Sequence, residues 1–325
     1  MLEFVNCNLC RSRTFKTIGT KFGLSLVKCK TCGLIYTNPR PQELERLQRY
    51  ESPLFFEEYL KNLKASPSSY DLAFIRNHYH PYLRLLNAYS APGKNLLDLG
   101  CGAGFFLKAA EEKGWKVEGV EISRSAAHYA RDIVRVTVHN GYLENLKLPS
   151  ENYDAVTLLD ILEHLPDPMG TLKEIHRILK REGVLILNTP DYNSLSRFFL
   201  GKDWAVLSPA EHLYNFTQKT LSTMLSRADF KTIVMRNLLI FNPDYTHNKK
   251  RAGFLLWKNI HTRLEETKTM ENIHGFEYLD LMKAGREPEE KTSNIDFIQK
   301  AKRNLHRKAK AWLRGDILIA VAAKS

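Results

Sequence analysis

Short apolar strands and helices alternate along this sequence, and that alternation constrains the fold more than any other feature. Patterns typical of helices fill most of the gaps between the strands, including residues 171–180 and 217–228. Strands that alternate with helices form a parallel, doubly wound sheet covered by helices. We therefore expect an α/β fold. The strands are expected at residues 95–99, 117–121, 134–138, 155–159, 184–187, 231–235 and 317–321.

A glycine-rich turn follows the first strand of this sheet. The run from Asp98 to Gly104, Asp-Leu-Gly-Cys-Gly-Ala-Gly, allows a ligand to approach backbone amides closely and then starts a helix. Phe105 stands where the dinucleotide fingerprint has its third glycine, and its side chain would crowd a pyrophosphate. Glu121 ends the second strand with a carboxylate that can accept hydrogen bonds from two ribose hydroxyls. The turn and Glu121 together indicate a ligand that contains a nucleoside.

At these residues the chain resembles the class I S-adenosylmethionine (SAM) dependent methyltransferases. Asp98 to Gly104 is similar to the first motif of that family, and Glu121 is similar to its ribose-binding acid. Residues 153–168, continuing to 177–180, resemble the fourth strand, the following loop and the helix of methyltransferases similar to the ubiquinone-biosynthesis O-methyltransferase. The resemblance implies a Rossmann-like methyltransferase sheet with SAM as cofactor. The cofactor-binding residues that it implies are Asp98, Gly100, Cys101, Gly102, Gly104, Glu121, Ile122, Tyr142, Leu143 and Asp160.

The segment after the third strand departs slightly from that family. Many relatives carry an acid where Tyr142 stands, so we expect adenine to contact the Tyr142 ring and the backbone amide of Leu143.

A glutamate and a histidine follow the fourth strand, at the end where open α/β sheets bind ligands. The resemblance to quinone O-methyltransferases implies that Asp160, Glu163 and His164 hold a divalent cation such as magnesium. The alternative is that Glu163 and His164 only fix the loop before Pro166 by hydrogen bonding. His164 is also the second candidate for a catalytic base.

A second such pair, Glu211 and His212, precedes the helix at residues 217–228. The segment from Glu211 to Phe216 resembles one in zinc-ribbon sugar methyltransferases, and the resemblance implies that His212 is the base facing the acceptor. Glu211 would orient or charge its ring. Sugar C-methyltransferases with this ribbon usually carry a further C-terminal domain, so we expect methylation of a hydroxyl. A purely structural role for His212 is the alternative.

Four of the five cysteines form two C-x-x-C pairs near the N-terminus, namely Cys7, Cys10, Cys29 and Cys32. Four thiolates at this spacing suit a tetrahedral zinc ion held across a hairpin. A redox dithiol is the less favoured alternative. Since four protein ligands leave no position for substrate or water, the zinc is expected to be structural.

These patterns divide the chain into parts with different roles. We expect a zinc ribbon at residues 1–41, a helical connector or lid with aromatic faces at 42–92, and the SAM-binding methyltransferase domain at 93–325. A helical insertion at 242–314 separates the last strand from the rest of that domain.

Charge and composition bear on partners and location. The formal net charge of +12 favours an anionic partner, and a basic, helical pattern at residues 295–314 could lie on an anionic membrane or grip RNA phosphates. We expect a small-molecule, sugar or lipid-linked acceptor. The alternative is an RNA methyltransferase. A nucleic acid partner is less favoured because residues 160–163 lack the motif by which many base N-methyltransferases hold a planar amine. Neither a signal peptide nor a spanning segment is indicated, so we expect a cytoplasmic protein, with peripheral membrane contact through the basic helix.

Overall fold

The computed structural model describes residues 2–90, 94–204, 206–238 and 317–324. It divides into two compact units, of which the first comprises Met1–Tyr192, Val206–Leu238 and Asp316–Ser325. The second comprises Asn193–Ala205 and Leu239–Gly315, and its described part holds α7 (Leu195–Leu200) and a 3-10 turn, η3 (Gly201–Asp203). The helical insertion expected at 242–314 and the basic helix expected at 295–314 lie outside the described residues.

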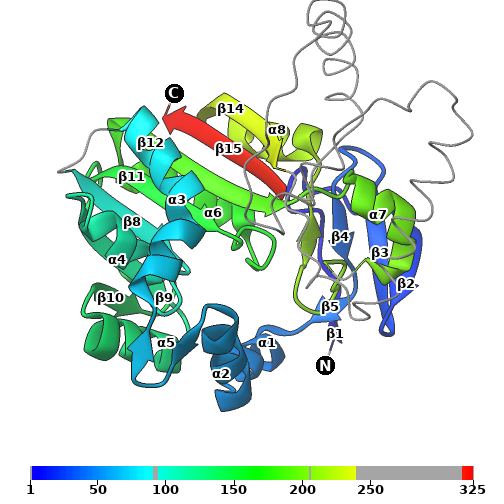
Figure 1. Ribbon diagram of the computed structural model, residues 1–325. Helices are drawn as coiled ribbons and strands as arrows, with labels where there is room; N and C mark the ends of the chain where they lie inside the picture. Colours follow the sequence, from blue (N-terminus) through cyan, green and yellow to red (C-terminus); the bar gives the residue numbers. More distant parts are fainter. Residues whose placement is uncertain (1, 91–93, 205, 239–316, 325) are drawn as a thin grey trace, which may run out of the picture. The chain divides into compact units, whose positions relative to one another are not determined.

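The first unit is built on a seven-stranded sheet of order β10-β9-β8-β11-β12-β15-β14 (Figure 1). Its strands β8 to β12 are parallel, whereas β15 runs antiparallel to both β12 and β14. Crossovers between parallel strands go through helices, and the order reverses beside β8, where such sheets bind ligands. The expected α/β doubly wound fold is therefore confirmed. The strands are β8 (Asn95–Leu99), β9 (Lys116–Glu121), β10 (Thr137–Asn140), β11 (Tyr153–Leu159), β12 (Leu179–Pro190), β14 (Phe230–Leu238) and β15 (Ile317–Lys324).

Helices pack beside these strands, and three of the four, α5, α6 and α8, begin at a side-chain cap. The Asp167 carboxylate accepts a hydrogen bond from the Gly170 amide at the start of α6, and Thr217 caps α8. Such caps satisfy amides that have no partner within the helix. Helix α4 packs on β9, α6 on β12 and α8 on β14. The helices are α4 (Phe105–Glu111), α5 (Arg124–Tyr129), α6 (Pro168–Ile178) and α8 (Gln218–Arg227).

One strand lies elsewhere than the sequence predicts. The strand expected at residues 134–138 begins only at Thr137, because a π-helical turn, η1 (Ala130–Val134), precedes it. Arg135 ends this turn with a φ of 64°, which is a left-handed conformation. Val134 and Val136 are both buried, so their alternation resembles that of a strand although the backbone is still turning.

The N-terminal cysteines lie in a small second sheet of order β13-β4-β3-β2. Three of its strands come from the N-terminus: β2 (Phe15–Lys21), β3 (Leu24–Cys29) and β4 (Ile35–Thr37). The fourth, β13 (Tyr214–Asn215), follows His212 in the chain and pairs with β4 through Tyr214 opposite Tyr36. A two-residue strand β1 (Leu2–Glu3) pairs with β5 (Arg40–Pro41). The ribbon sheet is thus completed by a segment of the methyltransferase part.

Three helices connect the ribbon to the main sheet, namely α1 (Glu43–Tyr50), α2 (Pro53–Asn62) and α3 (Leu72–Tyr89). A short hairpin of β6 (Ala65–Ser66) and β7 (Ser69–Tyr70) separates the last two. Pro53 at the first turn of α2 supplies a φ suited to a helix start. Helix α3 contacts α4, so the connector packs against the start of the main fold.

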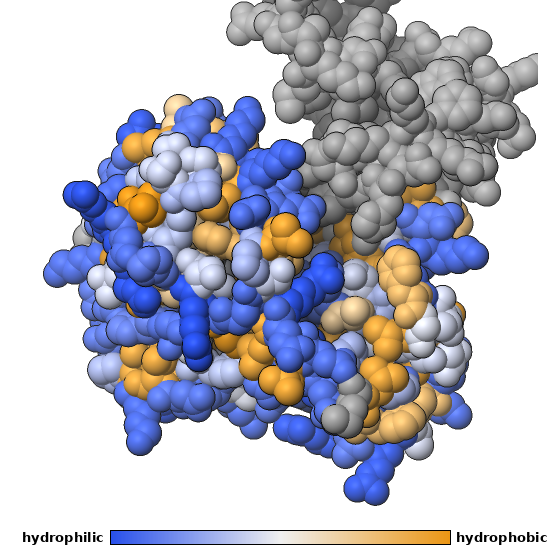
Figure 2. Space-filling model, turned by 90° about the horizontal axis from the view of Figure 1, so that it is seen from below, coloured by the Kyte–Doolittle hydropathy of each residue, from blue (hydrophilic) through white to orange (hydrophobic). Residues whose placement is uncertain are grey.

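One cluster of buried apolar residues runs through both sheets of the first unit. It includes Val27 and Tyr36 from the ribbon, Leu97 and Leu187 from the main sheet, and Leu213 beside β13. On the face shown in Figure 2, apolar residues gather in small groups among hydrophilic ones, which is usual for a protein surface. Among the described residues, no helix combines the length and apolar character needed to cross a membrane.

Candidate active site

The glycine-rich turn lies at the carboxyl end of β8 and is tied to the neighbouring strand. The amides of Gly100 and Cys101 both donate to the Val120 carbonyl, at 2.7 and 3.1 Å. Gly100, Gly102 and Gly104 have φ values of 71°, 53° and 77°, in the left-handed region that glycine tolerates best. The turn therefore has a backbone conformation suited to glycine, and the side chains of Ile161 and Tyr59 lie close against Gly100 and Gly102.

Glu121 lies beside this turn, at the end of β9. Its two carboxylate oxygens accept hydrogen bonds from the amides of Gly102 and Ser123, each at 2.8 Å. The residue is 8% exposed, and burial raises the pKa of its carboxyl. A carboxylate offers about four acceptor positions, so two remain for ribose hydroxyls. The geometry fits the role expected from the sequence.

Two aspartates lie near the same edge and have partners from neighbouring strands. Asp98 is 3% exposed and accepts a 2.6 Å hydrogen bond from the Thr157 hydroxyl of β11, while burial raises the pKa of its carboxyl to about 7. Asp160 follows β11 and accepts a 2.6 Å hydrogen bond from the side-chain amide of Asn188. No sequence pattern predicts that Thr157 and Asn188 hold these aspartates. Each is a polar residue inside an apolar strand, and its partner comes from another part of the chain.

Other residues expected at the cofactor site have varied surroundings. Cys101 is buried, and its sulfur lies so close to Gly119 that a Cβ there would clash with it, so its side chain packs in the core. The Leu143 side chain is also in the core, which leaves only its backbone for a ligand. The Asn140 side chain donates to the Ile122 carbonyl at 3.1 Å, while the Tyr142 hydroxyl bonds to the Glu43 carboxylate of α1.

The two glutamate-histidine pairs come together. The rings of His164 and His212 lie 4.6 Å apart, edge to face. The Tyr214 amide donates to the Glu163 carbonyl at 3.2 Å, which joins the segment after His212 to the loop after β11. Both rings are partly exposed, whereas Glu163 is 1% exposed and accepts a 2.9 Å hydrogen bond from Thr189.

Backbone carbonyls orient both rings. His212 donates from Nδ1 to the Val206 carbonyl at 2.6 Å, and His164 donates from Nδ1 to the Glu211 carbonyl at 3.0 Å. A carbonyl can only accept, so Nδ1 carries the proton in each neutral ring and Nε2 keeps its lone pair. Both histidines are therefore prepared to accept a proton or bind a metal through Nε2.

The structure corrects the partner expected for His212. Glu211 was expected to orient that ring, but its carboxylate pairs with Arg49 of α1, and its carbonyl bonds to His164 instead. The carbonyl of Val206 orients His212. The chain turns at residues 208–213, and this turn directs the Glu211 side chain toward the connector rather than toward the His212 ring.

Burial sets the charge of these groups. Burial lowers the pKa of His212 to about 4. Burial, followed by electrostatic repulsion from His212, lowers the pKa of His164 well below the usual range. Burial, followed by the nearby Asp160, raises the pKa of Glu163 to about 8. At neutral pH both rings are uncharged bases.

The potential metal ligands also differ from the set that the sequence suggests. Ligand atoms of Glu163, His164 and His212 lie within 4.8 Å of one another, and Asp160 is not in this group. Two imidazoles and a carboxylate suit a divalent transition metal better than magnesium, which prefers oxygen ligands.

The four N-terminal cysteines form a compact cluster, with ligand sulfurs within 4.8 Å of one another. The sulfurs of Cys7 and Cys32 lie 3.4 Å apart and those of Cys10 and Cys29 lie 3.5 Å apart, too far for disulfides. Each C-x-x-C pair forms the same turn: Arg11 donates its amide to Cys7, and Gly33 donates its amide to Cys29. Arg11 and Gly33 have left-handed φ values of 62° and 80°. This donor set fits a tetrahedral metal.

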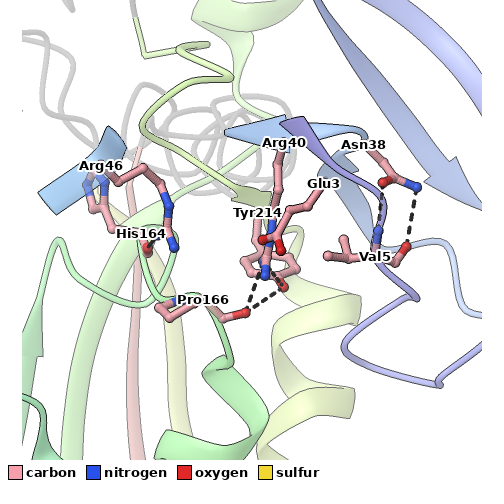
Figure 3. A network of polar contacts seen from close by, with 8 residues as sticks. All are labelled: Glu3, Val5, Asn38, Arg40, Arg46, His164, Pro166 and Tyr214. Carbon is pink, nitrogen blue, oxygen red and sulfur yellow. Dashed lines mark hydrogen bonds and ion pairs between the residues drawn. The ribbon is translucent and has the colours of Figure 1, made fainter. Parts of the chain in front are cut away.

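Sequence patterns do not mark the residues that join the ribbon to the active-site loop. Arg40 donates to the Pro166 carbonyl at 3.0 Å and to the Tyr214 hydroxyl at 3.1 Å (Figure 3). Asn8 donates to the Asp167 carboxylate at 2.7 Å and accepts from the Met169 amide at 3.0 Å. Asn8 lies between Cys7 and Cys10, so its hydrogen bonds connect the cysteine cluster to the loop after His164.

Comparison with known proteins gives the family. A family profile described as "Methyltransferase domain" matches residues 73–234. The ubiquinone biosynthesis O-methyltransferase of Alkalilimnicola ehrlichii is 30% identical over 189 residues, which are 50% of this chain and 76% of that protein. The enzyme of the same name from Histophilus somni is also 30% identical, over 39% of this chain and 55% of its own length.

A solved structure shares the fold. The SAM-dependent methyltransferase of Archaeoglobus fulgidus superimposes with a TM-score of 0.51 at 17% identity, covering 83% of this chain and all of that one (100%). Together with the sheet order and the glycine turn, these matches show that the chain is an enzyme that belongs to the class I SAM-dependent methyltransferases.

Proposed function

We propose that the enzyme transfers the methyl group of SAM to a hydroxyl of a small molecule, a sugar or a lipid-linked glycan. The observation that carries this proposal is His212, whose Nδ1 is held by Val206 so that Nε2 is free beside His164 and Glu163. Relatives named as O-methyltransferases support a hydroxyl as the acceptor.

In this proposal SAM binds at the carboxyl ends of β8, β9 and β10. The backbone of the Gly100–Gly104 turn passes its methionine and ribose portions, and the Glu121 carboxylate accepts from its ribose. Ile122, Tyr142 and Leu143 border the adenine. Asp98 and Asp160 complete the edge, with orientations supported by their bonds to Thr157 and Asn188.

SAM supplies a methyl group on a positively charged sulfur. The acceptor oxygen forms a bond to the methyl carbon as the carbon–sulfur bond breaks, and the electron pair of that bond neutralises the sulfur. The hydroxyl proton moves to Nε2 of His212. Because the oxygen becomes strongly acidic as it gains the methyl group, a histidine with a pKa of about 4 is basic enough to take the proton late in the transfer.

The test is His212→Ala. Removal of the base is expected to lower turnover by roughly 100-fold or more, while SAM affinity changes little because His212 is not among the nucleoside contacts. The rate should fall with decreasing pH only as pH passes through about 4, since the base must be neutral. Steady-state rates with labelled SAM and a panel of hydroxylated acceptors measure both effects.

His164→Ala is the matched control for His212→Ala. If His164→Ala abolishes turnover while His212→Ala does not, the proton acceptor lies in the loop after β11, and the proposal for His212 fails.

The ligand set of Glu163, His164 and His212 supports a second candidate role, in which these groups hold a divalent cation. A rate that added divalent metal raises in the zinc-loaded chain, without prior chelation, would assign them to that cation.

We further propose that Cys7, Cys10, Cys29 and Cys32 hold a structural zinc ion. Its support is the four-sulfur cluster and the matching turns of the two C-x-x-C pairs. Four thiolate ligands close the coordination shell, so the ion takes no part in methyl transfer.

A further inference from the structure

Helix α1 carries a buried arginine beside the two histidines. Arg46 is 9% exposed and donates from its guanidinium to the His164 carbonyl at a long 3.4 Å (Figure 3). Its Nε is buried and has no hydrogen-bond partner. A buried cation is normally paired, because removal from water costs several kcal/mol per ion.

Neighbouring arginines pair directly with carboxylates, whereas among the described residues Arg46 has no direct ion pair and is attracted only from a greater distance by Glu43. Arg40 pairs with Glu3 at 2.8 Å, and Arg49 pairs with Glu211. Glu43, on the same helix as Arg46, is bonded to the Tyr142 hydroxyl. Within the part of the chain that the structure describes, no carboxylate lies within ion-pairing distance of Arg46.

Arg46 and the neighbouring Tyr50 both lie beside His164. Tyr50, one turn further along α1, places its hydroxyl 3.4 Å from Nδ1 of His164. An anionic group bound there would lie next to the place where a hydroxyl meets His212.

We infer that the acceptor is an anion, and that Arg46 binds its carboxylate or phosphate group while the hydroxyl to be methylated faces His212. This inference rests on the proposed function and names its substrate class. A guanidinium presents donors in a planar fork that suits both oxyanions. An acceptor anion would supply the missing counter-ion and satisfy Nε at the same time.

Small anions test this without knowledge of the acceptor. The thermal midpoint of the full chain is measured against increasing inorganic phosphate or benzoate, with ionic strength held constant by sodium chloride. A ligand that binds only the folded state raises the midpoint in a saturable way. We expect such a rise for at least one of the two anions, and the tighter one identifies the group as phosphate or carboxylate.

Arg46→Gln should weaken the apparent affinity for that anion roughly tenfold or more, and Arg46→Lys should retain part of it. The matched control is Arg76→Gln. Arg76 is an exposed arginine on α3 that pairs with Glu112. This control variant should respond to the anion as the unaltered chain does. No saturable response in the unaltered chain, or an unchanged response in Arg46→Gln, would overturn the inference.

Stability gives a second measurement that does not depend on a ligand. Because Arg46 is buried without a counter-ion, Arg46→Met should melt at the same temperature as the unaltered chain or higher. A lower midpoint would mean that Arg46 serves the fold and would count against a binding role. SAM titrations and the His212→Ala rates are separate measurements, so the proposed function can fail while the anion response stands.

Discussion

Glu121 stabilises the fold and is also proposed to bind the cofactor. Its carboxylate holds the amides of Gly102 and Ser123, and in doing so it fixes the glycine turn against the end of β9. The same oxygens point to the edge of the sheet where the ribose is proposed to bind. Its position at the end of the strand after the glycine turn predicts this role from the sequence, and the role stays a prediction.

Glu121→Ala is therefore expected to weaken SAM binding by about 2 to 4 kcal/mol, because two hydrogen bonds to a charged acceptor are lost. Calorimetric titration with SAM measures this change. Glu118→Ala is the matched control, since Glu118 lies on the same strand but bonds to His139 and Tyr153. Equal affinity in Glu121→Ala and the unaltered chain would remove Glu121 from the cofactor site.

The contact between the two histidines could not be predicted from the sequence. The sequence identified His164 and His212 as separate candidates, each beside a glutamate. Their edge-to-face contact and the orienting carbonyls of Val206 and Glu211 depend on how distant segments fold together. Backbone carbonyls are present at every residue, so no sequence pattern could have shown which of them orient the rings.

At the scale of elements, periodic strands and helices were predictable, and irregular ones were not. Strand β8 and the start of α8 follow from apolar periodicity and a threonine cap. The π-helical turn before β10 and the two-residue strand β13 do not, because both are too short for a period to show. Strand β13 exists only because β4 offers it a partner.

Helix α2 contacts the glycine turn through Tyr59 and limits which side chains the turn can accommodate. The Tyr59 hydroxyl lies 3.4 Å from the Ala103 amide, and a Cβ on Gly102 would clash with that hydroxyl. Tyr59 of the connector therefore lies against the proposed cofactor site, and a role of the connector as a lid stays a prediction.

Gly102→Ala is expected to displace α2 and to weaken SAM binding roughly tenfold or more, since the added methyl group meets Tyr59 and the residue keeps a φ of 53°. Calorimetry measures the affinity. The double variant Gly102→Ala with Tyr59→Ala separates the two causes, because it removes the clash and leaves the backbone strain. Gly201→Ala is the control: it has a similar φ of 55° but open space around it. Normal SAM affinity in Gly102→Ala would show that α2 does not restrict the turn.

At the scale of the whole molecule, the ribbon and the methyltransferase sheet belong to one compact unit with a continuous core. The sequence separates them, because the cysteine pairs and the glycine turn are independent motifs. The structure joins them through β13, through Arg40 on Pro166, and through Asn8 on Asp167 and Met169. The segments that carry His164 and His212 both contact the ribbon.

Zinc removal should consequently affect more than the ribbon. If the four cysteines hold zinc, its removal frees the turn that contains Asn8 and weakens the link to the loop after His164. We expect chelation to lower the thermal midpoint of the first unit in a single transition, and to reduce turnover before global unfolding occurs. Cys29→Ser should have the same effects. Hydrogen exchange measures which amides lose protection, and those of β4, β13 and residues 163–169 should respond first. Full protection of residues 163–169 in the zinc-free protein, with turnover unchanged, would show that the ribbon folds independently of the active site.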